Sequence, residues 1–565
     1  MTGGDAARVF RIDREHAESA MTPALVGGKA AGLVRLARLG LDVPPAIVLP
    51  AALCRHYLQH GTLPDDFRVS LAESLRQIER ATGCTLGGAR PLLLSVRSSP
   101  PVSMPGMLKT IVNLGMTEGT AAALVRRTGN PWQAWDVYRR FVRSFGEVAA
   151  GCPAQVFDRV EAEHLSRARV DGIDDLDALA MRQLARDLAT TLEDHGARGI
   201  PLDPIDQIVA AVETVFDSWN APPACEYRRL NGLGADTGTG AVVQAMVFGN
   251  AGSRSGSGVC FTRNPATGAR ELYVDFLFNA QGDDVVGGRE AVRDGASLAA
   301  ALPDAWAQLT GAADRLERDF GDMLDVEFTI EEGRLFFLQC RAGKRTPWAA
   351  LQIAVDLVQE GRIEPPTALA RLDGCDLDAI RRVTLRLPDG TTPIARAIPA
   401  GVGVASGEIV FDSARAQMRG ASAPVILVRH DIATEDIAGL AASAGILTAF
   451  GGRTSHAAVV ARQLGKVCLV GCRDLRVDEQ GVSCTIGPHR LREGDIVTLD
   501  GEAGLVYAGK LPVATERPAT ALAIVHDWLR HAQCDLLSEA VESASFSPPH
   551  GGCHVDQGHS PDISR

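Results

Sequence analysis

The sequence predicts a multidomain protein of mixed α/β and α+β class. Its 565 residues exceed what one ordinary hydrophobic core supports, so three or four domains are expected. Hydrophobic residues make up 46% of the chain and charged residues 22%, a balance typical of soluble globular proteins. An apolar run at 425–428, a second one from Ile446, a pair of glycines and a helical pattern follow one another as in a strand–turn–helix unit. Strand-like runs between 241 and 341 predict a second region rich in strands.

Charge and cysteine content narrow the class of function. The net charge of −12 is spread along the chain, which argues against a nucleic acid or an anionic membrane as a partner. The sequence shows no N-terminal signal peptide and no apolar run long enough to span a bilayer. Its 12 cysteines are scattered and include no C-x-x-C pair. They are interpreted as reduced thiols of a cytoplasmic protein.

The first stretch that can carry chemistry is a glycine-rich turn at 26–33, which leads into a helix ending near Gly40. Lys29 on this turn could reach a phosphate, although such a lysine is more often a solvated helix start. The run 92–99 follows as a buried strand that presents Arg97 at its end. An arginine suits phosphate there because its planar fork makes paired, charge-assisted hydrogen bonds.

The segment from 118 to 222 is largely helical in pattern. Its aromatic residues recur at helical spacing and are expected to form core rather than a cofactor site. They are Trp132, Trp135, Tyr138, Phe141 and Phe145.

Strand patterns resume at Ala241 and continue to Arg341. Gly256 and Gly258 suit a mobile lid whose backbone N–H groups close over phosphates, or simply an ordinary turn. Further on, alternation along the run 325–330 puts Asp325 and Glu327 on one face of a strand. Such a carboxylate pair repels itself unless a cation lies between, and hard oxygen ligands suit Mg²⁺.

The segment at 446–471 holds the most specific pattern. Glycines end a buried strand, Thr454 or Ser455 can cap the next helix, and Gly465 stops it. His456 then lies in the first helical turn, where free N–H groups and the helix dipole favour a phosphoryl group. A lone histidine at a helix start is more often a polar cap, so its neighbours decide its interpretation.

The string G-G-R-T-S-H-A-A-V-V-A-R-Q-L-G at 451–465 resembles the phosphohistidine signature of the pyruvate phosphate dikinase and phosphoenolpyruvate synthase family. Arg453 and Val467 depart from that pattern, but neither position touches the chemistry. V-G-G-K and S-V-R-S resemble the start of the same family's nucleotide-binding domain. The resemblance implies that His456 carries phosphate between two distant active sites on a swivelling domain.

The resemblance also implies a fold and a set of site residues. The fold is an ATP-grasp nucleotide-binding domain followed by a small α/β swivelling phosphohistidine domain. Mg²⁺ is implied at Asp325 and Glu327, and the adenine along Gln244, Met246 and Val247. The residues implied around the nucleotide are Lys29, Arg97, Asp283, Asp284, Gln339 and Arg341.

Some positions in these motifs remain open. Arg139 and Arg140 match a similar pair in the family, and either one faces the nucleotide or both are solvated. Lys109 stands where the family usually has an acidic or amide residue, which could alter phosphate or metal handling. Asp283 replaces a frequent Glu and keeps the charge.

The expected domain boundaries follow from the same resemblance. The barrel of about 250 residues that such proteins carry after the linker helix is expected to be absent from this chain. The segments are 1–345 for the nucleotide-binding domain with a helical insertion at about 118–222, 346–392 for a helical linker, 393–511 for the phosphohistidine domain, 512–542 for a linker helix and 543–565 for a disordered tail.

Three hypotheses of function follow. In the first, the chain is the ATP half of a pyruvate, phosphate dikinase, which forms phosphohistidine on His456 and releases AMP. Inorganic phosphate or water would take the terminal phosphate, and a separate chain would bind phosphoenolpyruvate and pyruvate. The second hypothesis directs the same chemistry to another small-molecule acceptor. The third is a non-catalytic, nucleotide-binding remnant. Thr454 matches a regulatory phosphorylation site of some dikinases, although a helix cap is the simpler role.

Overall fold

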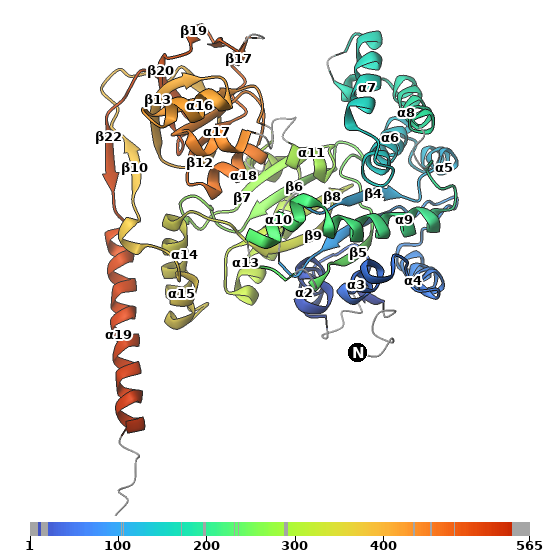
Figure 1. The fold of residues 1–565 in the computed structure, drawn as a ribbon, viewed down its shortest axis with the longest axis horizontal. Helices are drawn as coiled ribbons and strands as arrows, with labels where there is room; N and C mark the ends of the chain where they lie inside the picture. The colour runs from blue at the N-terminus through green and yellow to red at the C-terminus, as the bar shows by residue number, and fades with distance from the viewer. Residues whose placement is uncertain are drawn as a thin grey trace, which may run out of the picture.

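The computed structural model gives the architecture of most of the chain (Figure 1). The ranges it describes are 9–12, 21–102, 104, 107–170, 172–195, 199–230, 232–234, 237–287, 292–432, 436–452, 455–478 and 481–544.

The N-terminal region is built on a five-stranded antiparallel sheet in the order β1-β2-β5-β3-β4. Its strands are apolar on both faces, so Ile47 packs into one hydrophobic core and Val48 into another. The strands are β1 (Phe10–Ile12), β2 (Ala46–Leu49), β3 (Leu94–Ser99), β4 (Thr110–Leu114) and β5 (Gly240–Ala245). The accompanying helices are α1 (Pro23–Val26), α2 (Gly28–Arg38), α3 (Ala51–His60) and α4 (Phe67–Thr82).

A helical insertion separates β4 from β5. The aromatic residues expected in its core are there: Phe141 and Phe145 are buried on α6, and Trp132 is partly buried. The helices are α5 (Glu118–Thr128), α6 (Pro131–Val148), α7 (Ala154–Ala168), α8 (Ala178–Asp194), α9 (Pro204–Asp217) and α10 (Pro222–Leu230).

A second antiparallel sheet has the order β7-β6-β8-β9. The expectation that Gly256 and Gly258 form a lid or turn is wrong, because both lie within the fully buried strand β6. A Cβ at Gly256 would lie 2.2 Å from the Phe276 ring, so aromatic packing requires this glycine. The elements are β6 (Gly256–Phe261), β7 (Tyr273–Phe278), β8 (Leu324–Glu331), β9 (Arg334–Ala342), α11 (Gly282–Gly287), α12 (Gly295–Ala301) and α13 (Pro303–Phe320).

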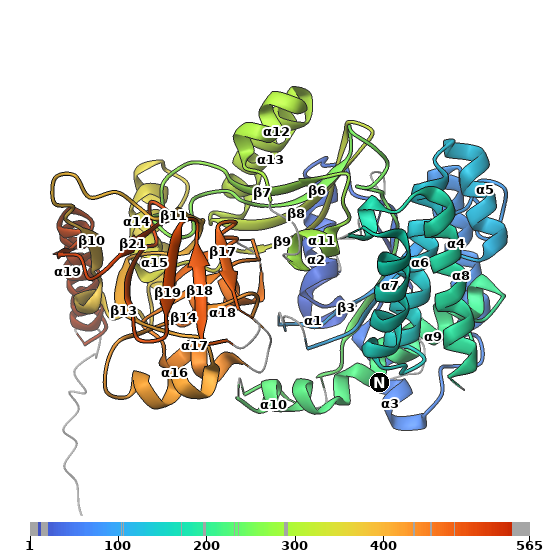
Figure 2. The ribbon, with the colours of Figure 1, turned by 90° about the horizontal axis from the view of Figure 1, so that it is seen from above.

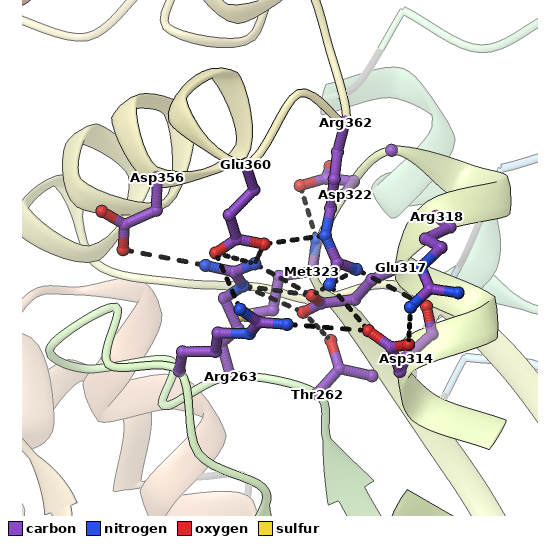
Figure 3. A network of polar contacts seen from close by, with 12 residues as sticks. Thr262, Arg263, Asp314, Glu317, Arg318, Asp322, Met323, Asp356, Glu360 and Arg362 are labelled. Atoms are coloured by element: carbon purple, nitrogen blue, oxygen red, sulfur yellow. Dashed lines mark hydrogen bonds and ion pairs between the residues drawn. The ribbon is translucent and has the colours of Figure 1, made fainter. Parts of the chain in front are cut away.

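Two linker helices, α14 (Pro347–Gln359) and α15 (Pro365–Arg371), follow the second sheet. A group of buried charges fastens them to it (Figure 3). Arg263 is fully buried and donates to Glu317 on α13 at 3.0 Å and to Glu360 after α14 at 2.8 Å. We call this group the linker ion network; its members are Arg263, Asp314, Glu317, Asp356, Glu360 and Arg362.

The third region, which we call the eight-stranded region, has the strand order β11-β21-β20-β13-β14-β15-β16-β12. Strands β13 to β16 pair in parallel, and β14 and β15 are the buried strands expected at 425–428 and from Ile446. The strands are β11 (Ala395–Arg396), β12 (Ile398–Gly401), β13 (Val404–Val410), β14 (Val425–Arg429), β15 (Gly445–Thr448), β16 (Val467–Val470), β20 (Ile496–Asp500) and β21 (Leu505–Ala508). The helices are α16 (Ser413–Gly420), α17 (Ile437–Ala442) and α18 (His456–Gln463), beside a small sheet of β17 (Leu475–Val477), β18 (Ser483–Ile486) and β19 (His489–Arg492).

The chain enters and leaves this region through one antiparallel ribbon, β10 (Arg382–Leu385) with β22 (Val513–Glu516). The C-terminal helix α19 (Ala519–Ala544) then packs its start against α14 and α15. It runs past the expected end of the linker helix at 542, and residues 545–565 of the expected tail lie outside the described ranges. In the part of the chain that is described, no helix is long and apolar enough to cross a membrane.

Candidate active site

The turn that carries Lys29 is held against the end of β3. The Gly28 N–H donates to Pro100 O at 2.8 Å, and the Ala30 N–H donates to Ser99 Oγ at 3.0 Å. Gly27 has a φ of +84°, and a Cβ there would lie 1.6 Å from Ser99 O. Only glycine permits this close approach. The first turn of α2 therefore lies beside the strand that carries Arg97.

Arg97 reaches from the first sheet to the second. Its Nη2 donates to Glu327 Oε2 on β8 at 2.9 Å, and its Nη1 donates to Leu338 O on β9 at 3.2 Å. The Arg97 side chain is 16% exposed and that of Glu327 is 27% exposed. A charge-assisted pair of this kind fixes both side chains. The candidate site thus lies where the two sheets meet.

Strand register brings the polar side chains of β8 and β9 together. Asp325 lies opposite Arg341, and Glu327 lies opposite Gln339. Arg341 Nε donates to Asp325 Oδ2 at 2.9 Å, and Gln339 Nε2 donates to Glu327 Oε1 at 3.1 Å. We call the whole group the nucleotide-site cluster; its members are Lys29, Arg97, Asp325, Glu327, Gln339 and Arg341.

The electrostatics of this cluster favour an anionic ligand. Burial, together with the charges of Arg97 and Arg341, lowers the pKa of the Lys29 ammonium to about 7, although Glu327 opposes the shift. Burial would raise the pKa of Glu327, but the charges of Arg97, Arg341 and Lys29 outweigh it and lower that pKa. Three cations therefore act on one carboxylate. A polyphosphate would supply the negative charge that this arrangement lacks.

One oxygen of the Asp325 carboxyl is buried without a partner, in the described part of the chain, that would stabilise its charge. The residue is 7% exposed, and its buried Oδ1 has no hydrogen-bond partner among the described residues. Burial raises the Asp325 pKa with help from Glu327, while Arg341 and Arg462 oppose the shift. An orphaned carboxylate oxygen is costly unless a cation meets it. Oxygen ligands suit Mg²⁺, so these residues fit that ion.

The ion's remaining ligands would come from outside the protein. Within the described ranges, no three or more His, Cys, Asp or Glu side chains gather as a metal site. Mg²⁺ is usually bound by one or two carboxylates together with substrate phosphates and water. Asp325 and Glu327 would supply the two carboxylates of such a site.

The two aspartates at the start of α11 have different surroundings. Arg140 donates from Nη1 and Nη2 to Asp284 at 2.8 and 2.9 Å, so Asp284 is committed to that arginine. Loss of solvation raises the pKa of Asp283 with help from the charges of Asp284 and Glu327, while Arg140 and Arg97 oppose the shift. Asp283 therefore lies within electrostatic reach of the nucleotide-site cluster.

The residues expected to line the adenine lie at the end of β5 and in the connection that follows it. Gln244 is buried and its Nε2 donates to Pro44 O at 3.1 Å, so its side chain is committed to the interior. The Met246 N–H donates to Leu93 O at 2.9 Å, and Val247 is buried beside it.

Helix α18 begins at His456. Of the two candidate cap residues, Ser455 caps this helix: its Oγ accepts from the Ala458 N–H at 3.5 Å. Arg453 and Thr454, and the side chain of His456, lie outside the described part of the structure. The backbone of His456 lies in the first turn, where helix N–H groups can hold an anion.

Several contacts bring α18 against the nucleotide-site cluster. The Arg462 guanidinium on α18 lies 5.6 Å from the centre of the Phe261 ring at the end of β6. Its charge also acts on the pKa of Asp325. Before the helix, a Cβ at Gly452 would lie 3.2 Å from Val292. Figure 2 shows the eight-stranded region beside the second sheet, with the helical insertion at the opposite end.

The sequence pattern did not single out Asp136 or Arg462. Arg462 lies six residues after His456, within the signature string but on the helix that follows the glycines. Asp136 stands among aromatic residues of α6, three and four positions before Arg139 and Arg140. That spacing puts all three on one helix face and is the signal that could have found the acidic residue.

Comparison with known proteins agrees with this geometry. Residues 61–296 match the family model of the pyruvate phosphate dikinase AMP/ATP-binding domain. Residues 421–504 match that of the mobile domain of PEP-utilising enzymes.

Similar relatives include three pyruvate, phosphate dikinases. The chain is 40% identical to the chloroplastic enzyme of Flaveria pringlei over 529 residues, which is 92% of this chain and 55% of the relative. It is 42% identical to the enzyme of Rhizobium meliloti over 503 residues, 86% of this chain and 56% of the relative. It is 40% identical to the enzyme of Clostridium symbiosum over 495 residues, which is 86% of this chain and 56% of the relative. The chain thus spans about half the length of the curated relatives it matches.

Proposed function

This chain belongs to the pyruvate, phosphate dikinase family, and from that premise we propose that it is an ATP-dependent phosphotransferase acting as the ATP half of the dikinase reaction. His456 is the proposed carrier of the phosphoryl group. One observation carries the proposal: the helix that begins at His456 also brings the Arg462 guanidinium to 5.6 Å from the ring of Phe261, which lies opposite Asp325 of the nucleotide-site cluster.

The proposed reaction has two steps. A ring nitrogen of His456 attacks the β-phosphorus of ATP, the bond between that phosphorus and the α–β bridging oxygen breaks, and AMP leaves. Inorganic phosphate then attacks the γ-phosphorus, so that diphosphate departs and phosphohistidine remains; with water in its place, inorganic phosphate would depart. Phosphoryl transfer of this kind depends mainly on positioning and on electrostatic stabilisation.

The residues around the nucleotide have separable proposed roles. Lys29, Arg97 and Arg341 would neutralise the phosphates, and Asp283 would lie beside them. Asp325 and Glu327 would hold Mg²⁺, which when bound neutralises phosphate charge. Gln244, Met246 and Val247 would line the adenine through the backbone at the end of β5 and just after it.

Carriage of the phosphoryl group requires the eight-stranded region to move. We propose that it swivels on the ribbon of β10 and β22, through which both connections of the chain pass. Cavities of about 540 and 560 Å³ lie between this region and the rest of the chain. An interface so loosely packed suits domains that separate and return.

The acceptor of the second half-reaction is also part of the proposal. Relatives named pyruvate, phosphate dikinase point to pyruvate, with phosphoenolpyruvate as product. A separate chain that binds phosphoenolpyruvate and pyruvate would provide that site, or another small-molecule acceptor would replace it. We place the protein in the cytoplasm, since the ten cysteines in its described part are all free, as in a reducing compartment.

Transfer of label from β-³²P-ATP to the purified protein tests this function. We expect acid-labile label on the wild type and none on His456→Ala. Dependence of the final phosphohistidine on inorganic phosphate identifies dikinase rather than synthase chemistry. Label on His456→Ala contradicts the carrier assignment, and ATP binding without any label contradicts the phosphotransferase assignment.

A further inference from the structure

A closed ring of hydrogen bonds joins the helical insertion to the second sheet. One member of this ring, Asp136 on α6, is fully buried. Its Oδ1 accepts from Arg139 Nε and Nη2 at 3.0 and 2.7 Å. Its Oδ2 accepts from Arg140 Nε at 2.8 Å and from Asn250 Nδ2 at 3.1 Å. One buried carboxylate therefore serves two guanidinium groups and an amide.

The ring continues through Arg140. This arginine donates its two terminal nitrogens to Asp284, whose Oδ2 also accepts from the Gln281 N–H at 2.8 Å. Gln281 Nε2 donates to Asn250 Oδ1 at 3.1 Å, and Asn250 leads back to Asp136. We call these five residues the Asp136 ring.

The members of the ring come from three separate parts of the chain. Arg140 and Asp136 lie on α6, which packs on β4 of the first sheet. Asn250 follows β5. Gln281 directly precedes α11 and Asp284 lies in its first turn, and α11 packs on the second sheet. Figure 2 shows α11 between that sheet and α6. The ring therefore ties together the two sheets that meet at the nucleotide-site cluster.

Charge pairs inside the ring fix the orientation of its side chains. Arg140 uses three nitrogens on two carboxylates, and bidentate guanidinium–carboxylate pairs combine strength with a fixed orientation. Removing the carboxylate of Asp136 would leave two guanidinium groups with fewer partners in a buried place. Arg140 could then leave Asp284, and the start of α11 would lose its anchor.

We propose that Asp136 is a positioning residue for the nucleotide site: it aims Arg140 at Asp284 and thereby holds the adjoining Asp283 near Arg97 and Glu327. This inference rests on the proposed function, since it assigns the ring to the ATP site. Asp284 then acts in the ring rather than on the nucleotide. A merely structural ion pair would affect stability and leave affinity for ATP unchanged.

A double-mutant cycle tests the proposal. The variants are Asp136→Asn, Asp284→Asn and the double variant, and the measurement is the Kd of Mg·ATP by calorimetry. We expect each single substitution to weaken binding about tenfold or more, because each removes a charged partner. The double variant should bind Mg·ATP no more weakly than the single variant of lower affinity, since both substitutions disrupt the same Asp136 ring.

The matched control is Asp158→Asn. Asp158 pairs with Arg143 in the same helical insertion, but its side chain is 58% exposed and outside the ring. Its loss should change the Kd by less than about twofold. Hydrogen exchange supplies an independent readout: segments 246–255 and 279–285 should exchange faster in Asp136→Asn and at the wild-type rate in the control.

Unchanged ATP affinity in folded Asp136→Asn, or losses that multiply in the double variant, would overturn the proposal. If Asp136→Asn does not fold, Asp284→Asn carries the same affinity and exchange test, because its side chain is 24% exposed. The two proposals fail separately. Wild-type protein that binds ATP but never labels His456 refutes the phosphotransferase, whereas labelled wild type with unchanged affinity in the variants refutes only the ring.

Discussion

The linker ion network and the nucleotide-site cluster are built from the same kinds of side chain. In the network, Arg263 is fully buried and has Glu317, Glu360 and, at 3.7 Å, Asp356 around it. Its second arginine, Arg362, pairs with members of the same set, so carboxylates outnumber cations. Each of these charged groups therefore lies near an opposite charge of the network, although Arg263 Nη1, 3.7 Å from Asp356, makes no hydrogen bond within the described residues.

The nucleotide-site cluster has the opposite balance. Lys29, Arg97 and Arg341 surround Glu327, and the Lys29 ammonium has its pKa lowered to about 7. Next to them, Asp325 Oδ1 is buried without a hydrogen-bond partner in the described structure. Burial and charge are common to both groups, so neither distinguishes them. In the nucleotide-site cluster, the buried Asp325 oxygen has no partner within the described residues, and three cations act on the one carboxylate of Glu327. This combination indicates a ligand site.

The largest effect that sharpens this contrast is expected from Asp325→Asn. Loss of this carboxylate should lower the rate of label transfer to His456 by about 10²- to 10³-fold, since it would remove a proposed ligand for Mg²⁺. Thermal stability should not fall. The pKa of Asp325 is raised on folding, so its ionised form opposes folding as the pH rises above the ordinary Asp range.

Scanning calorimetry and the β-³²P assay measure the two consequences of Asp325→Asn. The matched control is Asp314→Asn, a half-exposed aspartate of the linker ion network that should leave transfer within about twofold of wild type. Normal transfer by Asp325→Asn would show that the orphaned oxygen has no role in the reaction.

The next largest effect is expected from Glu317→Ala in the network. It leaves buried Arg263 and Arg362 with fewer partners, and the free energy of unfolding should fall by about 3 kcal/mol. Urea unfolding followed by the tryptophan fluorescence of the nucleotide-binding region measures this loss. Folded Glu317→Ala should bind Mg·ATP as wild type does. If Glu317→Ala lost much of its affinity for Mg·ATP and none of its stability, the linker ion network would serve ligand binding rather than folding.

The smallest effect concerns the proton of Lys29. With a pKa of about 7, the free amine is largely neutral at pH 8, and bound polyphosphate favours its charged form. Binding should therefore take up a proton, and affinity should fall by up to about tenfold as the pH rises by one unit above 7. Calorimetry in buffers of different ionisation enthalpy measures the uptake. Lys29→Met should abolish it, whereas uptake that persists in this variant would assign the proton to another group.

Local pattern was enough to predict much of the fold. The apolar runs at 425–428 and from Ile446 predicted the buried strands β14 and β15, and the glycines and cap residues after them predicted the start of α18 near His456. Alternation on β8 placed Asp325 and Glu327 together, since side chains two apart in a strand share a face. Each of these inferences needs only neighbours in sequence.

Pairings between distant residues could not be predicted in the same way. Arg140 and Asp284 are separated by 144 positions, and nothing in either local pattern says that they meet. Gly256 and Gly258 have the composition of a turn, but their place in β6 is set by the rings of Phe276 and Phe328. Tertiary packing overrides local preference at such positions.

Isotope exchange between AMP and ATP tests the central claim most directly. The first step of the proposed reaction is reversible and needs neither pyruvate nor inorganic phosphate. Wild-type protein with Mg²⁺ should therefore move ¹⁴C-AMP into ATP, and His456→Ala should not. Exchange of ADP rather than AMP would contradict the account, because it would mean transfer of the γ-phosphoryl group alone.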